Sequence, residues 1–385
     1  MANRKVVGTG EARSRSSESA SRDAAGAKHL GPRDLRLLAA CAILTAASWV
    51  LAETDAGPVA PFVVSAVALA LLASLVGRAV DALGDRLGAG ATGVVQSALG
   101  NLPELFVCIF ALKAGLYDVV RAAIVGSILS NVLLVLGLAF VFGGLKHGRQ
   151  RFSADRSRTL ALMLLLAVFA LAIPSATFAL HTPTASHEEA LSQITAIVLL
   201  VLFALSLPAA VAKGSADEAR AEKHAEAEAQ SVDHWPLGLA LGVLAGAAVA
   251  AAFVSDWFVA ALTPAMSAAH ISATFAGLVI VAIASNAVEN VVGIQLALRD
   301  KTDYALAVIL QSPLQVALVV APALVLAAPL VGATFTLVLS PLLLAALLIS
   351  VIVAFVVVFD GESTWFEGTA LVALYVLLAA GVWWG

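Results

Sequence analysis

The chain has 385 residues, of which 61% are hydrophobic and only 12% are charged, and its mean hydropathy is +0.97. A water-soluble domain of this size needs far more charge on its surface, so the composition excludes one and indicates a polytopic membrane protein. The net charge of -4 at pH 7 is small and gives no support for nucleic-acid binding. Cys41 and Cys108 lie inside apolar runs, where we expect small buried hydrophobes rather than a disulfide.

Residues 1–34 are rich in Ser, Ala, Gly and Arg and show no apolar periodicity, which predicts a disordered cytoplasmic tail. Residues 35–56 follow as an extra N-terminal transmembrane helix. A signal peptide is the alternative for this region, because small residues end the apolar run at Ala52. The polar stretch before the run is longer than a signal peptide carries, which favours a tail and a helix.

Eleven apolar runs come close to the ~20 residues that cross the hydrocarbon core of a bilayer. They cover residues 36–52, 58–80, 92–113, 119–143, 159–180, 192–212, 236–254, 274–298, 305–329, 334–359 and 366–384. The stretch from Asp256 to Ser272 contains Pro264 and His270, and we expect an outside loop there with some helix at the interface.

The Lys and Arg residues predict the orientation of these runs. With a cytoplasmic N-terminus, all 22 of them except Lys113 and Arg121 fall in cytoplasmic segments, as the positive-inside rule requires. An odd number of spans then places the C-terminus outside. We expect an integral protein of a bacterial inner (plasma) membrane, surrounded by lipid; nothing in the sequence specifies an oligomeric state.

Residues 213–235 interrupt the apolar pattern with acidic residues among alanines: Asp217, Glu218, Glu222, Glu226 and Glu228. Arg220 and Lys223 alternate with them, which is typical of a solvated cytoplasmic linker helix. A cation-sensing or regulatory role for this acidic helix is the alternative.

The regions on either side of this linker, residues 57–212 and 236–385, are two copies of one unit. A displacement of 185 residues, from Glu104 to Glu289, aligns them without a gap in the polar stretches. Because five spans separate the copies, the second crosses the membrane in the opposite direction, an arrangement typical of secondary transporters. The sequence thus predicts an all-α polytopic membrane protein of about 11 transmembrane helices, one N-terminal helix plus two inverted five-helix repeats.

The third and eighth runs carry the same polar pair at membrane depth. Asn101 and Glu104 lie three residues apart, on one face of a helix, and Asn286 and Glu289 repeat the spacing. A charge at this depth costs at least ~2.5 kcal/mol on insertion scales, so both carboxylates must face protein or a water-filled path. Pro103 removes a backbone donor and frees carbonyl oxygens in the turn before it.

The fourth and ninth runs add hydroxyl and amide groups, which completes an all-oxygen set suited to a hard cation such as Ca2+. We assign to the cation site Glu104, Glu289, Asn101, Asn286, Gly100, Ser285, Ser127 and Ser312. We assign to its polar support Ser130, Asn131, Gln315 and Asn290. The alternative is an interhelical hydrogen-bond cluster that only holds the bundle together.

The charge of this site suggests how two ions are coupled. A bound Ca2+ neutralises Glu104 and Glu289, two protons do the same, and two bare buried carboxylates are heavily penalised. If only neutral states cross between inward and outward forms, Ca2+ is exchanged for protons and the two glutamates carry both. We expect no cofactor and no enzyme, since no membrane-buried His accompanies Ser127 or Ser312 as an intramembrane hydrolase would need.

Three stretches of the first copy carry a family resemblance: Gly100-Asn101-Leu102-Pro103-Glu104-Leu105, Ala111-Leu112-Lys113-Ala114-Gly115 and Gly126-Ser127-Ile128-Leu129-Ser130-Asn131. They closely resemble the first alpha-repeat of Ca2+/H+ antiporters in the cation/Ca2+ exchanger superfamily. The stretch from Asp360 to Gly368 is similar to the last loop of that family. The resemblance implies one helix before two inverted five-helix halves and an ion site centred on the repeat glutamates.

The second copy departs from the family pattern. Ser285 and Asn290 flank Glu289 where the family usually has Gly and His, and Gln311 precedes Ser312 where it usually has Gly. A Na+ or K+/H+ or a Na+/Ca2+ exchanger on the same fold is therefore the alternative. By resemblance, Gly-Asn before Pro103-Glu104 favours the proton-coupled branch, and the inverted repeat disfavours a passive channel.

Overall fold

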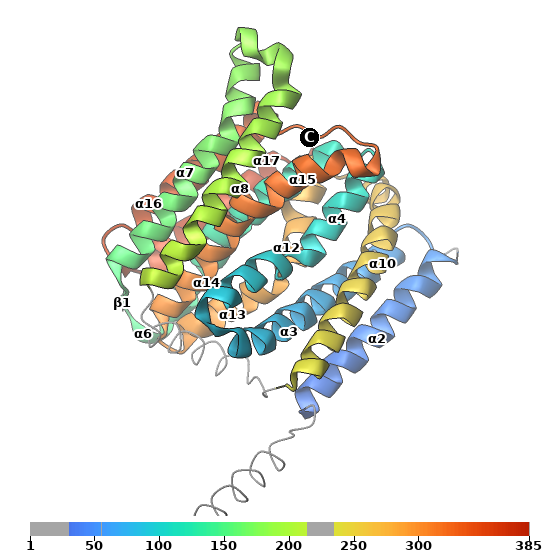
Figure 1. Cartoon of the computed structure of the whole chain (residues 1–385), viewed down its shortest axis with the longest axis horizontal. Helices are drawn as coiled ribbons and strands as arrows, with labels where there is room; N and C mark the ends of the chain where they lie inside the picture. Colours follow the sequence, from blue (N-terminus) through green and yellow to red (C-terminus); the bar gives the residue numbers. More distant parts are fainter. Residues whose placement is uncertain (1–30, 55, 214–234, 385) are drawn as a thin grey trace, which may run out of the picture.

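A computed structural model describes residues 31–54, 56–213 and 235–384, apart from the side chains at positions 81, 84–98, 207–213, 288 and 289 (Figure 1). Nearly all of the predicted tail and of the acidic linker therefore lies outside the described residues. Within these residues the structure is helical, except for connecting segments and one antiparallel pair of two-residue strands. The predicted all-α class is confirmed, and Cys41 and Cys108 are buried free cysteines.

The helices of the first half are α2 (Pro32–Ala52), α3 (Val59–Leu99), α4 (Leu102–Lys113), α5 (Tyr117–Leu129), the π-helical η1 (Ser130–Val135), α6 (Leu136–His147), α7 (Ala154–Ala179), the 3-10 turn η2 (Pro183–His187) and α8 (Glu188–Lys213). Those of the second half are α10 (Leu237–Ala269), α11 (Ala273–Phe275), the π-helical η3 (Ala276–Val281), α12 (Ala282–Ser285), α13 (Ala287–Leu298), α14 (Thr302–Gln315), the π-helical η4 (Val316–Val320), α15 (Ala321–Ala327), the 3-10 turn η5 (Ala328–Val331), α16 (Pro341–Val357) and α17 (Trp365–Gly381). The strands are β1 (Gln150–Arg151) and β2 (Glu362–Ser363).

Seven spans in the described part of the chain are long and apolar enough to cross a membrane, and a bent pair, Ala273–Ser285 with Asn290–Leu298, makes an eighth. Helices α16 and α17 are apolar and shorter. The count of eleven stays a prediction. The span Tyr117–His147 is the most enclosed, with 83% of its apolar window buried, whereas only 11% is buried in α2. The core of the bundle therefore lies around α5, η1 and α6.

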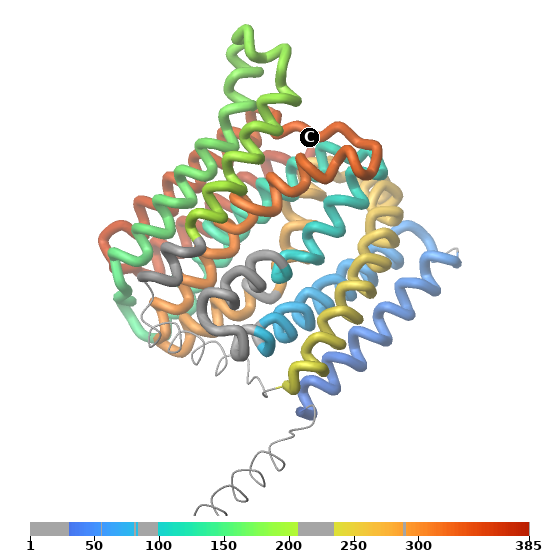
Figure 2. The backbone as a smooth tube through the Cα atoms, in the orientation of Figure 1, coloured from blue at the N-terminus to red at the C-terminus, as the bar shows by residue number. Residues whose placement is uncertain are grey.

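Helices α2, α3 and α10 lie side by side along one flank of the bundle, and α7, α8 and α16 form the opposite flank (Figure 2). Two predicted boundaries on the first flank are wrong. Helix α3 continues through residues 81–91, which we expected to separate two runs. Helix α10 continues to Ala269 through the predicted outside loop, with Pro264 inside it, because Phe258, Leu262 and Ala265 extend its buried face.

The tenth run is helical only from Pro341 onward, although we predicted a span from residue 334. Residues 333–340 have no regular secondary structure and are partly buried. Ser175 of α7 donates to the carbonyl of Leu337 at 2.8 Å and accepts from the amide of Leu339 at 2.9 Å. Ser192 of α8 accepts from the amide of Leu337 at 3.1 Å. Irregular backbone among apolar helices is stable only where such partners satisfy its polar groups.

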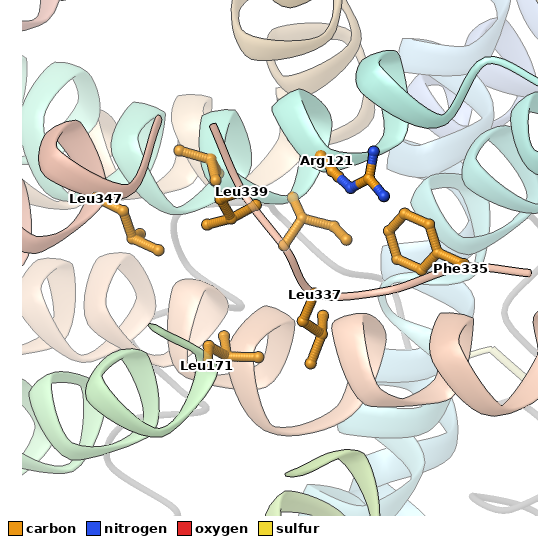
Figure 3. A pocket seen from close by; sticks show the side chains of 8 residues that line it. Arg121, Leu171, Phe335, Leu337, Leu339 and Leu347 are labelled. Carbon is orange, nitrogen blue, oxygen red and sulfur yellow. The ribbon is translucent and has the colours of Figure 1, made fainter. Parts of the chain in front are cut away.

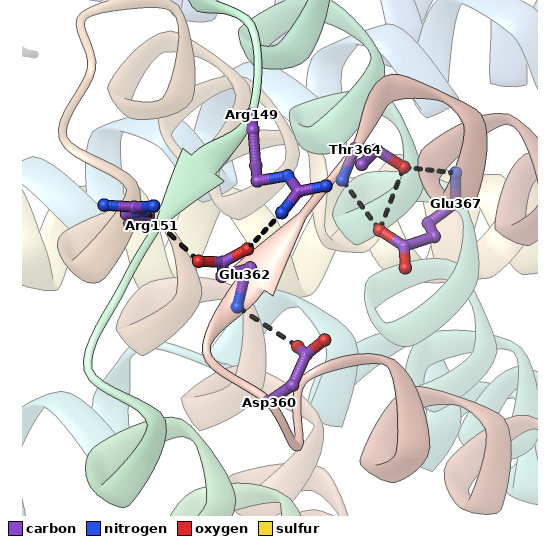
Figure 4. A network of polar contacts seen from close by, with 6 residues as sticks. All are labelled: Arg149, Arg151, Asp360, Glu362, Thr364 and Glu367. Carbon is purple, nitrogen blue, oxygen red and sulfur yellow. Dashed lines mark hydrogen bonds and ion pairs between the residues drawn. The ribbon is translucent and has the colours of Figure 1, made fainter.

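The connecting segments gather at two opposite ends of the bundle, with β1 at one end and the C-terminus at the other (Figure 1). At the first end, Glu362 on β2 accepts from Arg149 at 2.8 Å and from Arg151 at 3.2 Å (Figure 4). Thr364 and Glu367 form a capping box that begins α17 there. These contacts explain the polar residues of the predicted last loop, because they bind β2 to the arginines beside and within β1 and form the start of α17.

Candidate cation site

Two helix breaks with the same backbone conformation lie in the two copies. Asn101 separates α3 from α4 with φ -95° and ψ 16°. Asn286 separates α12 from α13 with φ -102° and ψ 21°, and the eighth span bends by 62° around it. Glu104 thus lies in the first turn of α4, and the backbone of Glu289 lies in the first turn of α13. The N-terminal end of a helix favours negative charge, so both breaks suit a carboxylate.

Asn286 is the centre of a hydrogen-bond network that joins the copies. Its Nδ2 donates to Oγ of Ser127 at 2.9 Å and to the carbonyl of Ala282 at 2.9 Å. Its Oδ1 accepts from Oγ of Ser312 at 3.4 Å. The side chain of Ser285 turns back to the carbonyl of Val281, 3.0 Å away. The break of the second copy is therefore fixed to α5 of the first copy and to α14 of its own.

Asn101 makes the reciprocal connection. Its Nδ2 donates to Oε1 of Gln315 at 3.1 Å, and both side chains are buried. Gln315 ends α14 directly before η4. Each helix break thus contacts a helix of the other copy through an amide side chain.

The π-helical segments η1 and η4 begin at equivalent places, Ser130 and Val316, one residue apart after displacement by the repeat. Nδ2 of Asn131 in η1 donates to the carbonyl of Ser127 at 2.9 Å and to Oγ of Ser312 at 3.4 Å. Ser130 also donates to the carbonyl of Ser127, at 3.1 Å. Oδ1 of Asn131 is buried and accepts no hydrogen bond from the described residues. A buried amide oxygen in this state can serve as a cation ligand.

Glu104 is 2% exposed, and both its carboxylate oxygens are shielded from solvent. A bare carboxylate in such a place is strongly penalised, which favours a bound cation or a proton. The side chain of Glu289 lies outside the described residues. Among the described side chains there is no group of three His, Cys, Asp or Glu that could hold a metal ion. The described part of the site offers amide and hydroxyl oxygens besides the carboxylate of Glu104, and such oxygens are ligands that a hard cation accepts.

The family model described as sodium/calcium exchanger protein matches two stretches of the chain, residues 58–211 and 239–384. The chain belongs to this exchanger family. It is 32% identical to a Ca2+/H+ antiporter of Aphanothece halophytica over 330 residues, which covers 82% of this chain and 88% of the relative. It is 33% identical to the Ca2+/H+ antiporter ChaA of Bacillus subtilis (strain 168) over 321 residues, covering 83% and 91%.

Solved structures show the same polytopic fold for this exchanger. The structure of native YfkE matches with a TM-score of 0.76 and 30% identity, covering 90% of this chain and 99% of that one. The structure of the H+/Ca2+ exchanger CAX matches with a TM-score of 0.70 at 16% identity, which supports the fold.

Hydrogen bonds join six of the predicted site residues of the exchanger in one network: Asn286, Ser127, Ser312, Ser285, Asn131 and Ser130. Asn101 and Gln315 form a separate pair. Gly100 and Asn290 lie next to the two helix breaks. Gly100 is partly buried beside the first break. Asn290 donates its backbone amide to the carbonyl of Asn286 at 3.1 Å, and its buried Oδ1 accepts no hydrogen bond from the described residues.

Sequence reasoning missed a polar contact that holds α2 against the bundle. Asp34 accepts from Arg78 of α3 and, at 3.1 Å, from the indole nitrogen of Trp235 just before α10. A carboxylate two residues after Pro32, at the start of an apolar run, is the signal that could have indicated it.

One pocket of the described structure is lined by apolar side chains and by a single arginine, so it has no ligands for a cation. Leucines from three segments line it together with Phe335, and Arg121 is its one charged lining residue (Figure 3). The guanidinium of Arg121 lies over the ring of Phe335 and donates to Thr336. A cationic group and apolar walls exclude this pocket as a cation site.

Proposed function

We propose that this family member is a secondary active transporter that exchanges Ca2+ for H+ across the membrane by alternating access. The observation that carries the proposal is that each of two like helix breaks forms a hydrogen bond with the opposite copy, Asn286 with Ser127 at 2.9 Å and Asn101 with Gln315 at 3.1 Å. In this proposal the first turns that carry Glu104 and Glu289 face hydroxyl and amide oxygens of the opposite copy. The relatives described above are Ca2+/H+ antiporters by name, which supports the same ions.

In this proposal Ca2+ and H+ are the transported ions and no further cofactor or enzymatic step takes part. The Ca2+ ligands come from Glu104, Glu289, Asn101, Asn286, Gly100, Ser285, Ser127 and Ser312. Ser130, Asn131, Gln315 and Asn290 support them. Glu104 and Glu289 carry Ca2+ in one direction and protons in the other. The deep burial of Glu104 supports this coupling, because its bare charge makes an empty, unprotonated site costly to move.

We further propose that residues 57–212 and 236–385 are inverted repeats, after an extra helix at 35–56, with a cytoplasmic N-terminus and an outside C-terminus in a bacterial inner membrane. Two observations support this arrangement. The family model matches each region separately. The β1–β2 end, where Arg149 and Arg151 lie, is opposite to the end that holds the C-terminus (Figure 1), as the positive-inside rule requires.

Uptake of radioactive Ca2+ into proteoliposomes with an imposed pH gradient tests the exchange. We expect uptake that depends on the gradient and is lost in Glu104→Gln and in Glu289→Gln. The matched control is Glu189→Gln, an exposed carboxylate at the start of α8, which should retain wild-type uptake. Uptake that ignores the pH gradient, or that persists in both variants, contradicts the proposal. Uptake driven instead by a Na+ or K+ gradient identifies the alternative exchanger on this fold.

A further inference from the structure

Equivalent faces of α5 and α14 are packed very differently. On α5, Val119, Ala122, Ala123 and Gly126 are all buried. Displacement by 185 residues, from Gly126 to Gln311, gives the matching face of α14: Tyr304, Ala307, Val308 and Gln311. Of these only Ala307 is buried, Tyr304 and Val308 are partly exposed, and Gln311 is exposed. The two faces therefore occupy equivalent positions in the repeat but are packed differently.

The α5 face is closed by direct contact with η3 of the second copy. A Cβ atom at Gly126 would lie 2.2 Å from the carbonyl oxygen of Leu278. A Cβ atom at Gly277 would lie 2.3 Å from the carbonyl oxygen of Val119. Neither position has room for a side chain. Two glycines thus allow the backbones of α5 and η3 to meet, which closes the bundle between the site and the end where α5 begins.

The α14 face cannot close in the same way, because Gln311 occupies the position equivalent to Gly126. Gln311 lies one turn before Gln315, on the same helix face, and Gln315 contacts Asn101 in the site. In the other direction, α14 begins at Thr302, which accepts a hydrogen bond from Gln150 of β1 at 3.1 Å. An exposed amide at this depth suits a water-filled path and not lipid.

We infer that Gly126 and Gly277 form the closed gate on the outer side, and that Gln311 lines an open path from the cytoplasmic side to Gln315 and keeps that side from closing as tightly. The inference rests on the proposed exchanger and adds to it a conformational bias. Glycines permit full closure on one side only, so the inward-open state is the favoured state of the empty protein.

The test compares two cysteines at equivalent positions, Val308→Cys on α14 and Ala123→Cys on α5. A membrane-impermeant maleimide is applied separately to each side of oriented membrane vesicles, without ion gradients. If the outward-open state holds no more than about 10% of the population, as is usual for a minor state, cytoplasmic labelling at 308 should exceed outside labelling at 123 at least about tenfold. The unsubstituted protein sets the background, since Cys41 and Cys108 are buried.

Two further variants move the gates in opposite directions. Gln311→Gly should lower the cytoplasmic labelling of Val308→Cys, because it removes the side chain at the position equivalent to Gly126 and lets the α14 face pack more closely. Gly126→Ala should raise the outside labelling of Ala123→Cys, because its Cβ has no room beside Leu278. Gln311→Cys, labelled directly, replaces Val308→Cys if that variant does not fold.

Equal labelling at positions 308 and 123, or labelling at 308 that Gln311→Gly leaves unchanged, overturns the inference. Failure of the proposed exchange looks different: vesicles would show no pH-driven Ca2+ uptake while the labelling pattern holds. If uptake is normal and neither position 308 nor position 311 is labelled from the cytoplasm, the exchanger stands and the gate assignment is wrong.

Discussion

Asn101 donates a hydrogen bond from Nδ2 to Oε1 of Gln315 across the interface between the two halves of the chain, at a distance of 3.1 Å. Asn101 directly precedes α4, and Gln315 is the last residue of α14. Because the two residues lie in different copies, any movement of one copy against the other must stretch or break this bond. It therefore connects the geometry of the site to the motion that the proposed exchange requires.

The first prediction concerns this pair. Gln315→Ala leaves the buried amide of Asn101 without its acceptor, a loss of about 1–3 kcal/mol. We expect a roughly tenfold to hundredfold weaker apparent affinity for Ca2+, measured as the Ca2+ concentration at half-maximal uptake. A double-mutant cycle with Asn101→Ala should show strong coupling. Additive effects of the two substitutions would show that the bond has no role in holding the site.

The second prediction concerns Asn131, whose Oδ1 is buried and accepts no hydrogen bond from the described residues. Asn131→Leu keeps the number of side-chain heavy atoms and replaces Oδ1 and the donor Nδ2 with methyl groups. If that oxygen supports the cation, the apparent affinity for Ca2+ should weaken by about tenfold or more, which corresponds to ~1.4 kcal/mol of binding free energy. The comparison is Val316→Leu, because Val316 holds the equivalent place in the second copy and is apolar. Equal effects of the two substitutions would indicate a packing defect.

Much of this architecture follows from sequence because lipid imposes simple rules on a chain. Buried carboxylates such as Glu104 are conspicuous in an apolar run, and the displacement that matches it to Glu289 also matches the helix breaks at Asn101 and Asn286. The candidate site residues can be proposed from sequence because polar groups at membrane depth are costly and therefore conspicuous. The partner of each group cannot, since Asn286 could bond several hydroxyls and only the packing selects Ser127.

The errors arose where distant parts of the chain decide local structure. Residues 333–340 have the apolar composition of a helix, and their backbone is instead held by Ser175 and Ser192, which lie more than a hundred residues earlier. At Pro264 the opposite error occurred: we predicted a loop and the structure has a helix. Tertiary packing of α10 outweighs the one backbone hydrogen bond that the proline removes. Gly126 is buried and Gln311 is exposed. Under the proposed alternating access, the burial of each position differs between the inward and outward conformations, so sequence alone could not predict it.

The third prediction tests the support of the irregular segment before α16. Ser175→Ala removes one donor and one acceptor that serve Leu337 and Leu339 in a buried setting. We expect a loss of about 1–3 kcal/mol in the free energy of unfolding, seen as a lower melting temperature in detergent. Ser186→Ala is the control, because Ser186 is exposed in the turn η2. A melting temperature equal to that of the control would mean that water replaces the lost hydroxyl.

The fourth prediction concerns Asp34, which holds α2 to the rest of the bundle. Its carboxylate is nearly buried and accepts from Arg78 and from Trp235, whereas α2 itself buries little of its surface. Asp34→Ala leaves Arg78 unpaired; breaking a fully buried pair costs about 3–5 kcal/mol. Because 20% of the Arg78 side chain is exposed, we expect a loss at or below the lower end of that range, read as earlier thermal unfolding or earlier proteolysis after α2.

The control for Asp34 is an ion pair of similar chemistry at the surface. Asp155 lies 3.9 Å from Arg158 and its side chain is 99% exposed, so Asp155→Ala should change stability by less than ~1 kcal/mol. Asp34→Asn should lie between the two, because it removes the charge and keeps an acceptor for the indole of Trp235. If Asp34→Ala unfolds like the Asp155 control, apolar contacts alone hold α2 in place. If it unfolds earlier and Ca2+ uptake is unchanged, α2 supports the bundle without taking part in transport.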